Sequence, residues 1–113
     1  MEAALKAIAE PRRREILRLV WDAERSAGEI AAHFDVSRPA ISQHLRVLRE
    51  ADLIFQRREG TKRFYRARPE RLAELGEFLE GFWRDNLISL KRAAEKEERR
   101  KARADAGDHR DHS

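Results

Sequence analysis

Four side chains that lie close together in the sequence are of types that read nucleobases or bind phosphates. They are Arg38, Ser42, Gln43 and Arg46. An Arg can donate two hydrogen bonds to the O6 and N7 atoms of guanine, a Gln pairs with N6 and N7 of adenine, and a Ser bonds to bases or phosphates. On their own these residues are more typical of a solvated helix surface. The elements that position these side chains therefore decide whether they bind nucleic acid or only cover a solvated helix.

A helix over about residues 38–51 is expected to carry these side chains. Ser37 is of a type that caps helix N-termini, and Pro39 falls in the first turn, where its fixed φ suits a helix. The apolar residues follow a spacing of i, i+4 and i+7, which predicts one buried face. They are Ile41, Leu45 and Leu48. With this face on the core, the four polar side chains point outward or flank it.

A shorter helix is expected just before it, at residues 27–34. The sequence from Ser26 to Glu29 has the capping-box form S-x-x-E, which marks a helix start. Residues 35–36 then make a tight turn. Two helices joined in this way form a helix-turn-helix, which places the N-terminal residues of its second helix on base edges in the major groove. The N-terminus of that helix also favours phosphate through its free N–H groups.

A β-hairpin with a basic tip is predicted after the second helix. Apolar and aromatic residues at 53–55 and 64–65 flank a polar, Gly-containing segment, which is the pattern of a hairpin. The polar side chains expected on it are Arg57, Arg58, Thr61, Lys62 and Arg63. Such a hairpin resembles a wing, whose cations straddle phosphates or enter the adjacent minor groove. Helix, turn, helix and basic hairpin together favour nucleic-acid binding over a merely solvated surface.

Charge and composition narrow the class of protein. Residues 37–68 hold nine Lys or Arg against three Asp or Glu, a net charge of +6, whereas the whole 113-residue chain carries +4. Phosphate neutralisation needs such a concentration of positive charge. The absence of Cys excludes disulfides and thiolate metal sites. No apolar run approaches the roughly 20 residues that cross a bilayer, and no secretory signal is seen, so we expect a cytoplasmic protein.

Helices are also expected on both sides of this region. Residues 1–10 read as a short helix, and Pro11 starts another that runs to about residue 22 with Ile16, Leu17, Val20 and Trp21 at helical spacing. From Glu70 a long helix carries an apolar row that is too aromatic for a solvated face and needs a partner surface. The row is Leu72, Leu75, Leu79, Phe82, Trp83, Leu87 and Leu90.

At this point the chain resembles the ArsR family of bacterial winged-helix repressors. The resemblance lies in residues 5–17 (LKAIAEPRRREIL), 29–34 (EIAAHF), 36–45 (VSRPAISQHL) and 48–54 (LREADLI). It covers about residues 3–90. One departure is Asp52, where the family usually has Gly after the recognition helix; Asp tolerates a left-handed backbone better than most residues.

The resemblance implies a fold and an assembly. The expected fold class is mainly α with a small β-hairpin, a winged helix-turn-helix with a long C-terminal dimerisation helix. Residues 1–94 would form the DNA-binding and dimerisation domain, and residues 95–113 a charged, flexible tail. The resemblance also implies a homodimer joined by the first and last helices. The expected interface residues are Leu5, Ile8 and the apolar row from Leu72 to Leu90.

The resemblance implies that Ser37, Arg38, Ser42, Gln43 and His44 face DNA. For His44 a second interpretation stays open, because its spacing puts it at the edge of the buried face, where a structural histidine is equally expected.

No cofactor or metal is expected. Some members of this family sense metals through thiolates, which this chain lacks. His109 and His112 have an H-x-x-H spacing that a metal can use, but they follow Gly107 in a polar tail without core support. A lone histidine such as His33 is more often structural. This leaves a metal-independent protein, with an effector or partner protein that the sequence does not identify.

The expected function is that of a homodimeric repressor that binds double-stranded DNA at a palindromic operator. The alternatives are a winged-helix protein-interaction module, which would use the surface around Phe78, Phe82 and Trp83, and a non-specific DNA-binding protein. The basic helix and hairpin argue against the first. An enzyme is not expected, because the sequence has no phosphate-binding Gly-rich loop and no paired nucleophile and base.

Overall fold

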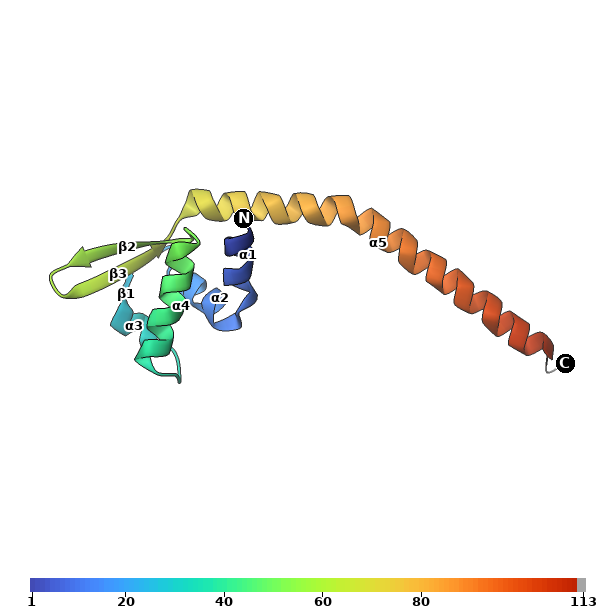
Figure 1. Ribbon diagram of the computed structural model, residues 1–113, viewed down its shortest axis with the longest axis horizontal. Coiled ribbons are helices and arrows are strands. Elements are labelled where there is room, and N and C mark those ends of the chain that lie inside the picture. The colour runs from blue at the N-terminus through green and yellow to red at the C-terminus, as the bar shows by residue number, and fades with distance from the viewer. Residues whose placement is uncertain (112–113) are drawn as a thin grey trace. The chain divides into compact units, whose positions relative to one another are not determined.

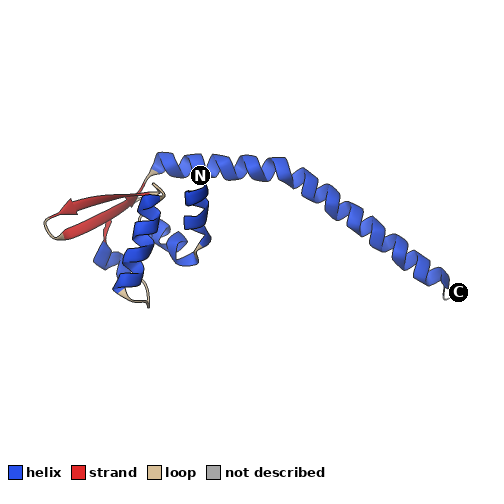
Figure 2. Ribbon diagram, viewed as in Figure 1, coloured by secondary structure: helices blue, strands red, loops and turns tan. Residues whose placement is uncertain are grey.

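The helices and strands follow the expected order in the computed structural model, which describes the backbone of residues 1–111 and the side chains of residues 1–105. The expected fold class is confirmed: helices dominate, and a small antiparallel sheet follows the helix-turn-helix (Figure 2). The elements are α1 (Glu2–Ala9), α2 (Pro11–Leu19), β1 (Arg25–Ser26), α3 (Ala27–Ala31), α4 (Arg38–Glu50), β2 (Ile54–Glu59), β3 (Lys62–Ala67) and α5 (Pro69–Asp111).

Two units make up the chain, residues 1–76 and the remainder of α5 from Glu77. In the first unit, α4 lies between the α1–α2 pair and the sheet (Figure 1). Its predicted row of Ile41, Leu45 and Leu48 is buried, each residue being at most 2% exposed. The core around this row includes Ile16, Val20, Ile30, Leu53, Ile54 and Tyr65.

The sheet has three strands, one more than the sequence predicts. β2 and β3 pair as the expected hairpin, with Arg58 opposite Arg63. The additional strand, β1, pairs with β3 and places Arg25 opposite Tyr65. A strand of two residues has too few positions to show an alternating pattern, so periodicity could not reveal it.

Two predicted helices end earlier than expected. The second stops at Leu19, and Trp21, which the spacing placed in its apolar row, is 56% exposed. The third stops at Ala31, although Phe34 still packs against the core. The backbone leaves the second helix at Val20, which is still buried, so helical spacing no longer places Trp21 in the core.

The predicted cap residues are confirmed at both helices of the helix-turn-helix. Ser26 Oγ accepts a hydrogen bond from Glu29 N at 3.1 Å, while the Glu29 side chain accepts one from Ser26 N at 3.3 Å. Ser37 Oγ accepts from Ala40 N at 3.3 Å. These bonds satisfy N–H groups that have no partner within the helix, and they fix where α3 and α4 begin.

Asp52 ends α4 in the left-handed conformation that the sequence suggested, with φ of 61°. Leu53 N donates to Leu48 O at 3.0 Å and Asp52 N to Arg49 O at 2.9 Å. This pair of bonds is a Schellman cap, and it turns the chain from α4 directly into β2.

Two substitutions at Asp52 test whether its left-handed backbone conformation is strained. A left-handed conformation costs an L-residue about 1–2 kcal/mol, and the greater flexibility of Gly in the unfolded chain takes back about 0.4–1 kcal/mol. We expect Asp52→Gly to raise the free energy of unfolding by up to about 1.6 kcal/mol on these figures, and Asp52→Val to lower it. Urea unfolding of the two variants measures the difference; equal stabilities would contradict a strained Asp52.

α5 continues as one helix from Pro69 to Asp111 and so includes most of the residues expected to form a tail. The domain boundary at residue 94 and the flexibility of residues 95–113 stay predictions. The helix itself is consistent with a sequence rich in Ala, Glu, Lys and Arg, which are strong helix formers. No helix among residues 1–111 is long and apolar enough to span a membrane.

Candidate nucleic-acid interface

α4 presents a polar face on the side opposite its core row. Arg38, Ser42, Gln43 and Arg46 are all exposed. Because successive helical residues are about 100° apart, Gln43 lies about 200° round the helix from the buried Ile41 and points most directly away from the core. Arg46 Nε donates to Glu50 Oε1 at 3.0 Å, one turn further along the same surface. Arg38, Ser42 and Gln43 thus stand exposed on the N-terminal half of α4, while Arg46, in the C-terminal half, is paired with Glu50.

A groove of about 370 Å³ lies where α4, the start of α3 and the hairpin meet. Three of its lining residues are basic, from two separate elements: Arg38 on α4, with Lys62 and Arg63 on β3. No carboxylate lines it. The other lining residues are Ser26, Ala27, Gly28, Ser42, Thr61 and Tyr65. Cations and hydroxyls that converge from helix and hairpin are suited to holding an anionic group such as a phosphate.

A second, smaller groove of about 200 Å³ continues along α4 towards its C-terminus. Ser42, Tyr65 and Arg63 line both grooves, and the second adds Arg46 and Arg49. Gln56 Oε1 accepts hydrogen bonds from Arg49 and, at 3.4 Å, from the Tyr65 hydroxyl. The two grooves together form a basic channel between α4 and the hairpin.

Four of the five predicted hairpin side chains are exposed without a carboxylate partner among the described side chains. They are Arg58, Thr61, Lys62 and Arg63. Gly60 makes the tight turn between the strands possible, because its φ of 61° is unfavourable for residues with a Cβ. The tip therefore presents its cations to solvent on a narrow two-stranded arm.

Arg57 differs from the other hairpin cations because it is already paired. Its guanidinium lies 2.5 Å from Glu24 Oε1 and 2.9 Å from Glu59 Oε2, and it stacks over the Phe64 ring at 4.7 Å. The Arg57 side chain holds the pKa of the Glu24 carboxyl below its ordinary value. Glu24 precedes β1 by one residue, so this ion pair ties the hairpin to the loop after α2. We expect Arg57 to position the hairpin rather than to bind phosphate.

This role of Glu24 can be tested through the pH dependence of stability. A carboxyl whose pKa is depressed by folding stabilises the protein above its unfolded pKa and loses that contribution as the pH falls through the folded pKa. We expect Glu24→Gln to unfold at lower urea than the parent protein at pH 7, and the difference to disappear as the pH falls below the ordinary Glu value of 4.5. Glu77→Gln is the matched control. A Glu24→Gln difference that does not change with pH would contradict the ion pair.

His44 is half-buried on the flank of α4, next to the start of α2. Burial lowers the pKa of its imidazole, and the neighbouring Arg13 guanidinium lowers it further. Both effects favour the neutral ring. The two interpretations of His44, as a DNA contact and as a structural histidine, both stay predictions.

The expected interface residues fall into two groups by burial. In the first unit, Leu5, Ile8 and Leu72 are half-buried against the core and Leu75 is only 5% exposed. In the α5 segment from Glu77, the expected residues are exposed by 38% to 58% in the single chain. They are Leu79, Phe82, Trp83, Leu87 and Leu90, and Phe78 and Ile88 lie exposed beside them.

Several residues of the site were missed by sequence reasoning. Gly28 lies against the Arg38 guanidinium: a Cβ built at Gly28 would be 3.9 Å from that Arg38 Nη2 atom. Arg49 and Gln56 line the channel, and Glu24 orients Arg57. The basic character of Arg49 was a usable signal. The Glu24–Arg57 pair joins residues far apart in sequence, and no local pattern reveals it.

No group of three His, Asp or Glu side chains lies close enough to hold a metal ion among the residues that the structure describes. The side chains of His109 and His112 lie outside the described residues, so the H-x-x-H spacing is not tested.

Comparisons with known proteins agree with this geometry. The model of the family described as "Bacterial regulatory protein, arsR family" matches residues 10–55. The transcriptional repressor SdpR of Bacillus subtilis is 43% identical over 65 residues, which are 58% of this chain and 72% of SdpR. The transcriptional activator HlyU of Vibrio cholerae is 43% identical over 61 residues, 54% of this chain and 56% of HlyU. The crystal structure of a "possible transcriptional regulator for arsenical resistance" matches with a TM-score of 0.68 at 43% identity, covering 77% of this chain and 94% of that one.

Proposed function

The chain belongs to the ArsR family of bacterial transcriptional regulators, and from this premise we propose that it is a homodimeric repressor that binds a palindromic DNA operator. Like the other members of this family, it is a DNA-binding regulator. It is not an enzyme. The observation that carries the finer proposal is the basic channel between α4 and the hairpin, with the exposed polar face of α4 beside it.

In this proposal α4 enters the major groove. Gln43 and Arg46 then face base edges, where Gln can bond to adenine and Arg to guanine. Arg38, Lys62 and Arg63 meet a backbone phosphate in the 370 Å³ groove. The hairpin tip extends along the same backbone. Phosphate contacts fix the register of the protein, and the α4 face supplies the sequence preference.

The homodimer is supported by the apolar surface of α5. Phe78, Phe82, Trp83, Ile88 and Leu90 are each more than 40% exposed in the single chain. Exposed aromatic residues that recur on one helix are typical of a protein–protein interface. A two-fold dimer would present two α4 helices to successive major grooves, about 34–36 Å apart, which is why the operator is expected to be palindromic.

Repression is the proposed direction of regulation. SdpR is named a repressor and HlyU, at equal identity, an activator. A dimer that occupies a promoter excludes RNA polymerase, whereas one bound upstream can activate transcription. The position of the operator therefore determines the direction of regulation. We place the protein in the bacterial cytoplasm because its proposed partner, DNA, is there. The chain has no Cys, so an effector, where there is one, acts without thiolate ligands.

The salt dependence of DNA binding tests the role of the hairpin. Each phosphate contact contributes about 0.9 to the slope of log K against log salt. We expect the triple change of Arg58, Lys62 and Arg63 to Ala to reduce that slope by roughly 2.7 per bound chain if each residue makes one phosphate contact. Fluorescence anisotropy on a labelled duplex between 50 and 200 mM KCl, roughly the range over which such slopes are read, gives the value.

The matched control removes three positive charges outside the channel, by changing Arg18, Arg84 and Lys91 to Ala. The control should keep the slope of the parent protein. If the hairpin variant also keeps it, the hairpin does not bind phosphates and the proposed docking is wrong. Equal reductions in both variants would indicate only a general effect of net charge.

A further inference from the structure

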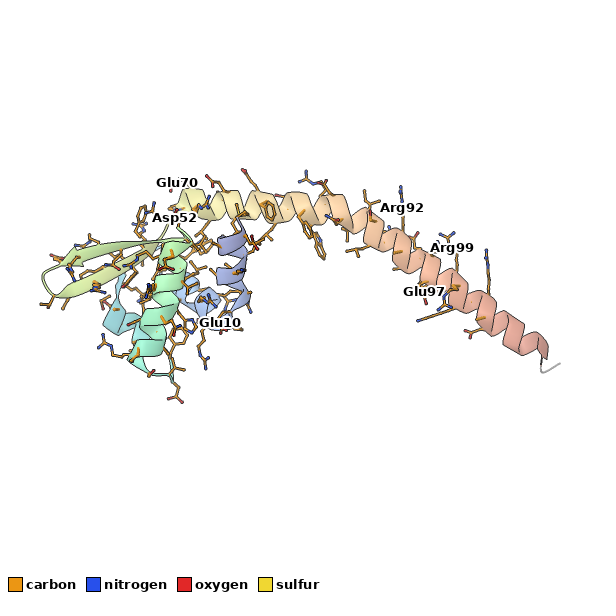
Figure 3. All side chains as sticks on the ribbon, in the orientation of Figure 1. Glu10, Asp52, Glu70, Arg92, Glu97 and Arg99 are labelled. Atoms are coloured by element: carbon orange, nitrogen blue, oxygen red, sulfur yellow. The ribbon has the colours of Figure 1, made fainter. Side chains whose placement is uncertain are left out.

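The segment of α5 from residue 91 to 105 carries a row of cations that the proposed interface does not use. The row consists of Arg92, Lys96, Arg99 and Arg103, all of them exposed. At about 100° per residue these four side chains fall within an arc of about 60° on one side of the helix. Glu98 and Asp105 lie about 120–140° away from Arg92 by the same geometry. In Figure 3 Arg92 and Arg99 stand along one edge of α5, and Glu97 along the other.

None of the four cations is in an ion pair among the side chains that the structure describes. The one ion pair in this segment joins Arg100 and Glu97, 2.6 Å apart, beside the row. Glu95 borders the row and is the nearest carboxylate to it by helical position. A solvated helix stabilised by its own pairs would intersperse both signs of charge, whereas here four of the seven cations of residues 91–105 share one face.

The segment is not suited to packing against another helix. Its apolar residues are all Ala, at positions 93, 94, 102 and 104. Paired helices need larger apolar side chains every three to four residues. The row can therefore bind by charge, and a partner for it must be an extended polyanion.

We propose that this row, Arg92–Lys96–Arg99–Arg103, is a second DNA-binding surface, which holds backbone phosphates outside the bases that α4 reads. The inference rests on the proposed function, which brings DNA to this chain. From residue 92 to 103 the helix rises about 16 Å. One strand of B-DNA presents a phosphate about every 3.4 Å along its axis, so roughly five lie within that length. Four cations with long, flexible stems match this density of charge.

A pair of matched double variants tests the proposal in the full chain. Arg99→Gln with Arg103→Gln removes two charges from the row; Lys91→Gln with Lys101→Gln removes two from elsewhere on the same segment. Gln is a good helix former, and far-UV circular dichroism checks that helicity is kept. The probe is a labelled 40-base-pair duplex of mixed sequence, titrated by anisotropy at several KCl concentrations.

The row variant is expected to reduce the slope of log K against log salt by about 1.8 per bound chain, while the Lys91 and Lys101 variant keeps the parent slope. The proposal is overturned if both variants keep that slope, or if both reduce it equally. It is also overturned if the row variant changes only the oligomeric state in sedimentation, because the row would then bind a second copy of this chain.

Failure of the proposed function is a separate result. It would appear as a protein that binds a selected operator no better than the mixed-sequence duplex. The slope difference between the two double variants does not depend on that preference.

Discussion

Changing Phe82 and Trp83 together to Ser is expected to weaken the proposed homodimer about 1,000-fold. Both side chains are more than half exposed in the single chain, at 56% and 58%, and neither belongs to the core of the first unit. Truncating a central aromatic residue of an interface typically costs about 2 kcal/mol or more. Two such losses amount to about 4 kcal/mol, and every 1.4 kcal/mol is a factor of ten.

Sedimentation equilibrium measures the loss of dimer affinity directly. Arg84→Ser, at the next residue of the same helix, is the control. The unfolding of residues 1–76, followed by urea titration, should be little affected, because the two aromatic residues are not part of that core. Operator binding should fall with the dimer. An unchanged dimer dissociation constant would mean that the aromatic surface of α5 binds something other than a second copy.

Changing Gln43 to Ala is expected to lower affinity for the operator by about 5- to 150-fold. Gln43 is exposed and lies opposite the buried row of α4. A well-placed bidentate contact to a base is worth about 1–3 kcal/mol of discrimination. The change removes no charge, so binding to DNA of unrelated sequence should stay the same.

Competition binding gives both affinities in one experiment, with the operator and a shuffled duplex of equal length as competitors. A preferential loss at the operator would assign base reading to Gln43. Equal losses on the two duplexes would mean that Gln43 contributes to general affinity or to folding, and the orientation of α4 in the groove would have to be revised.

The features of the fold that local sequence determines were predictable. Ser26, Glu29 and Ser37 are caps that work through side chains within three residues, so the pattern and the structure agree. The buried row of α4 follows from helical periodicity alone. Asp52 departed from the family pattern, and its tolerance of positive φ correctly indicated a left-handed cap.

Features that depend on distant contacts were not predictable in the same way. β1 is a strand only because Arg25 and Ser26 meet β3 some forty residues later. The phosphate contact expected of Arg57 stays a prediction, but its ion pair with Glu24, from the other side of the helix-turn-helix, was not predicted. Composition identifies both residues as charged without showing that they meet.

The apolar row on α5, from Leu72 to Leu90, shows a third limit of prediction from sequence. Its spacing predicted a helix with one apolar side, and the helix is there. Leu75 is buried within its own chain, whereas Phe82 and Trp83 are not. Periodicity shows that a side chain needs cover, but the tertiary structure decides whether the same chain or a partner supplies it.

Selection from a random-sequence duplex library by the purified protein, followed by sequencing, tests whether the protein binds a palindromic operator. We expect enrichment of an inverted repeat, with half-site centres one helical turn, about 10–10.5 base pairs, or a multiple of it apart. Library members bound without any enriched sequence, and released at moderate salt, would contradict a sequence-specific dimeric regulator.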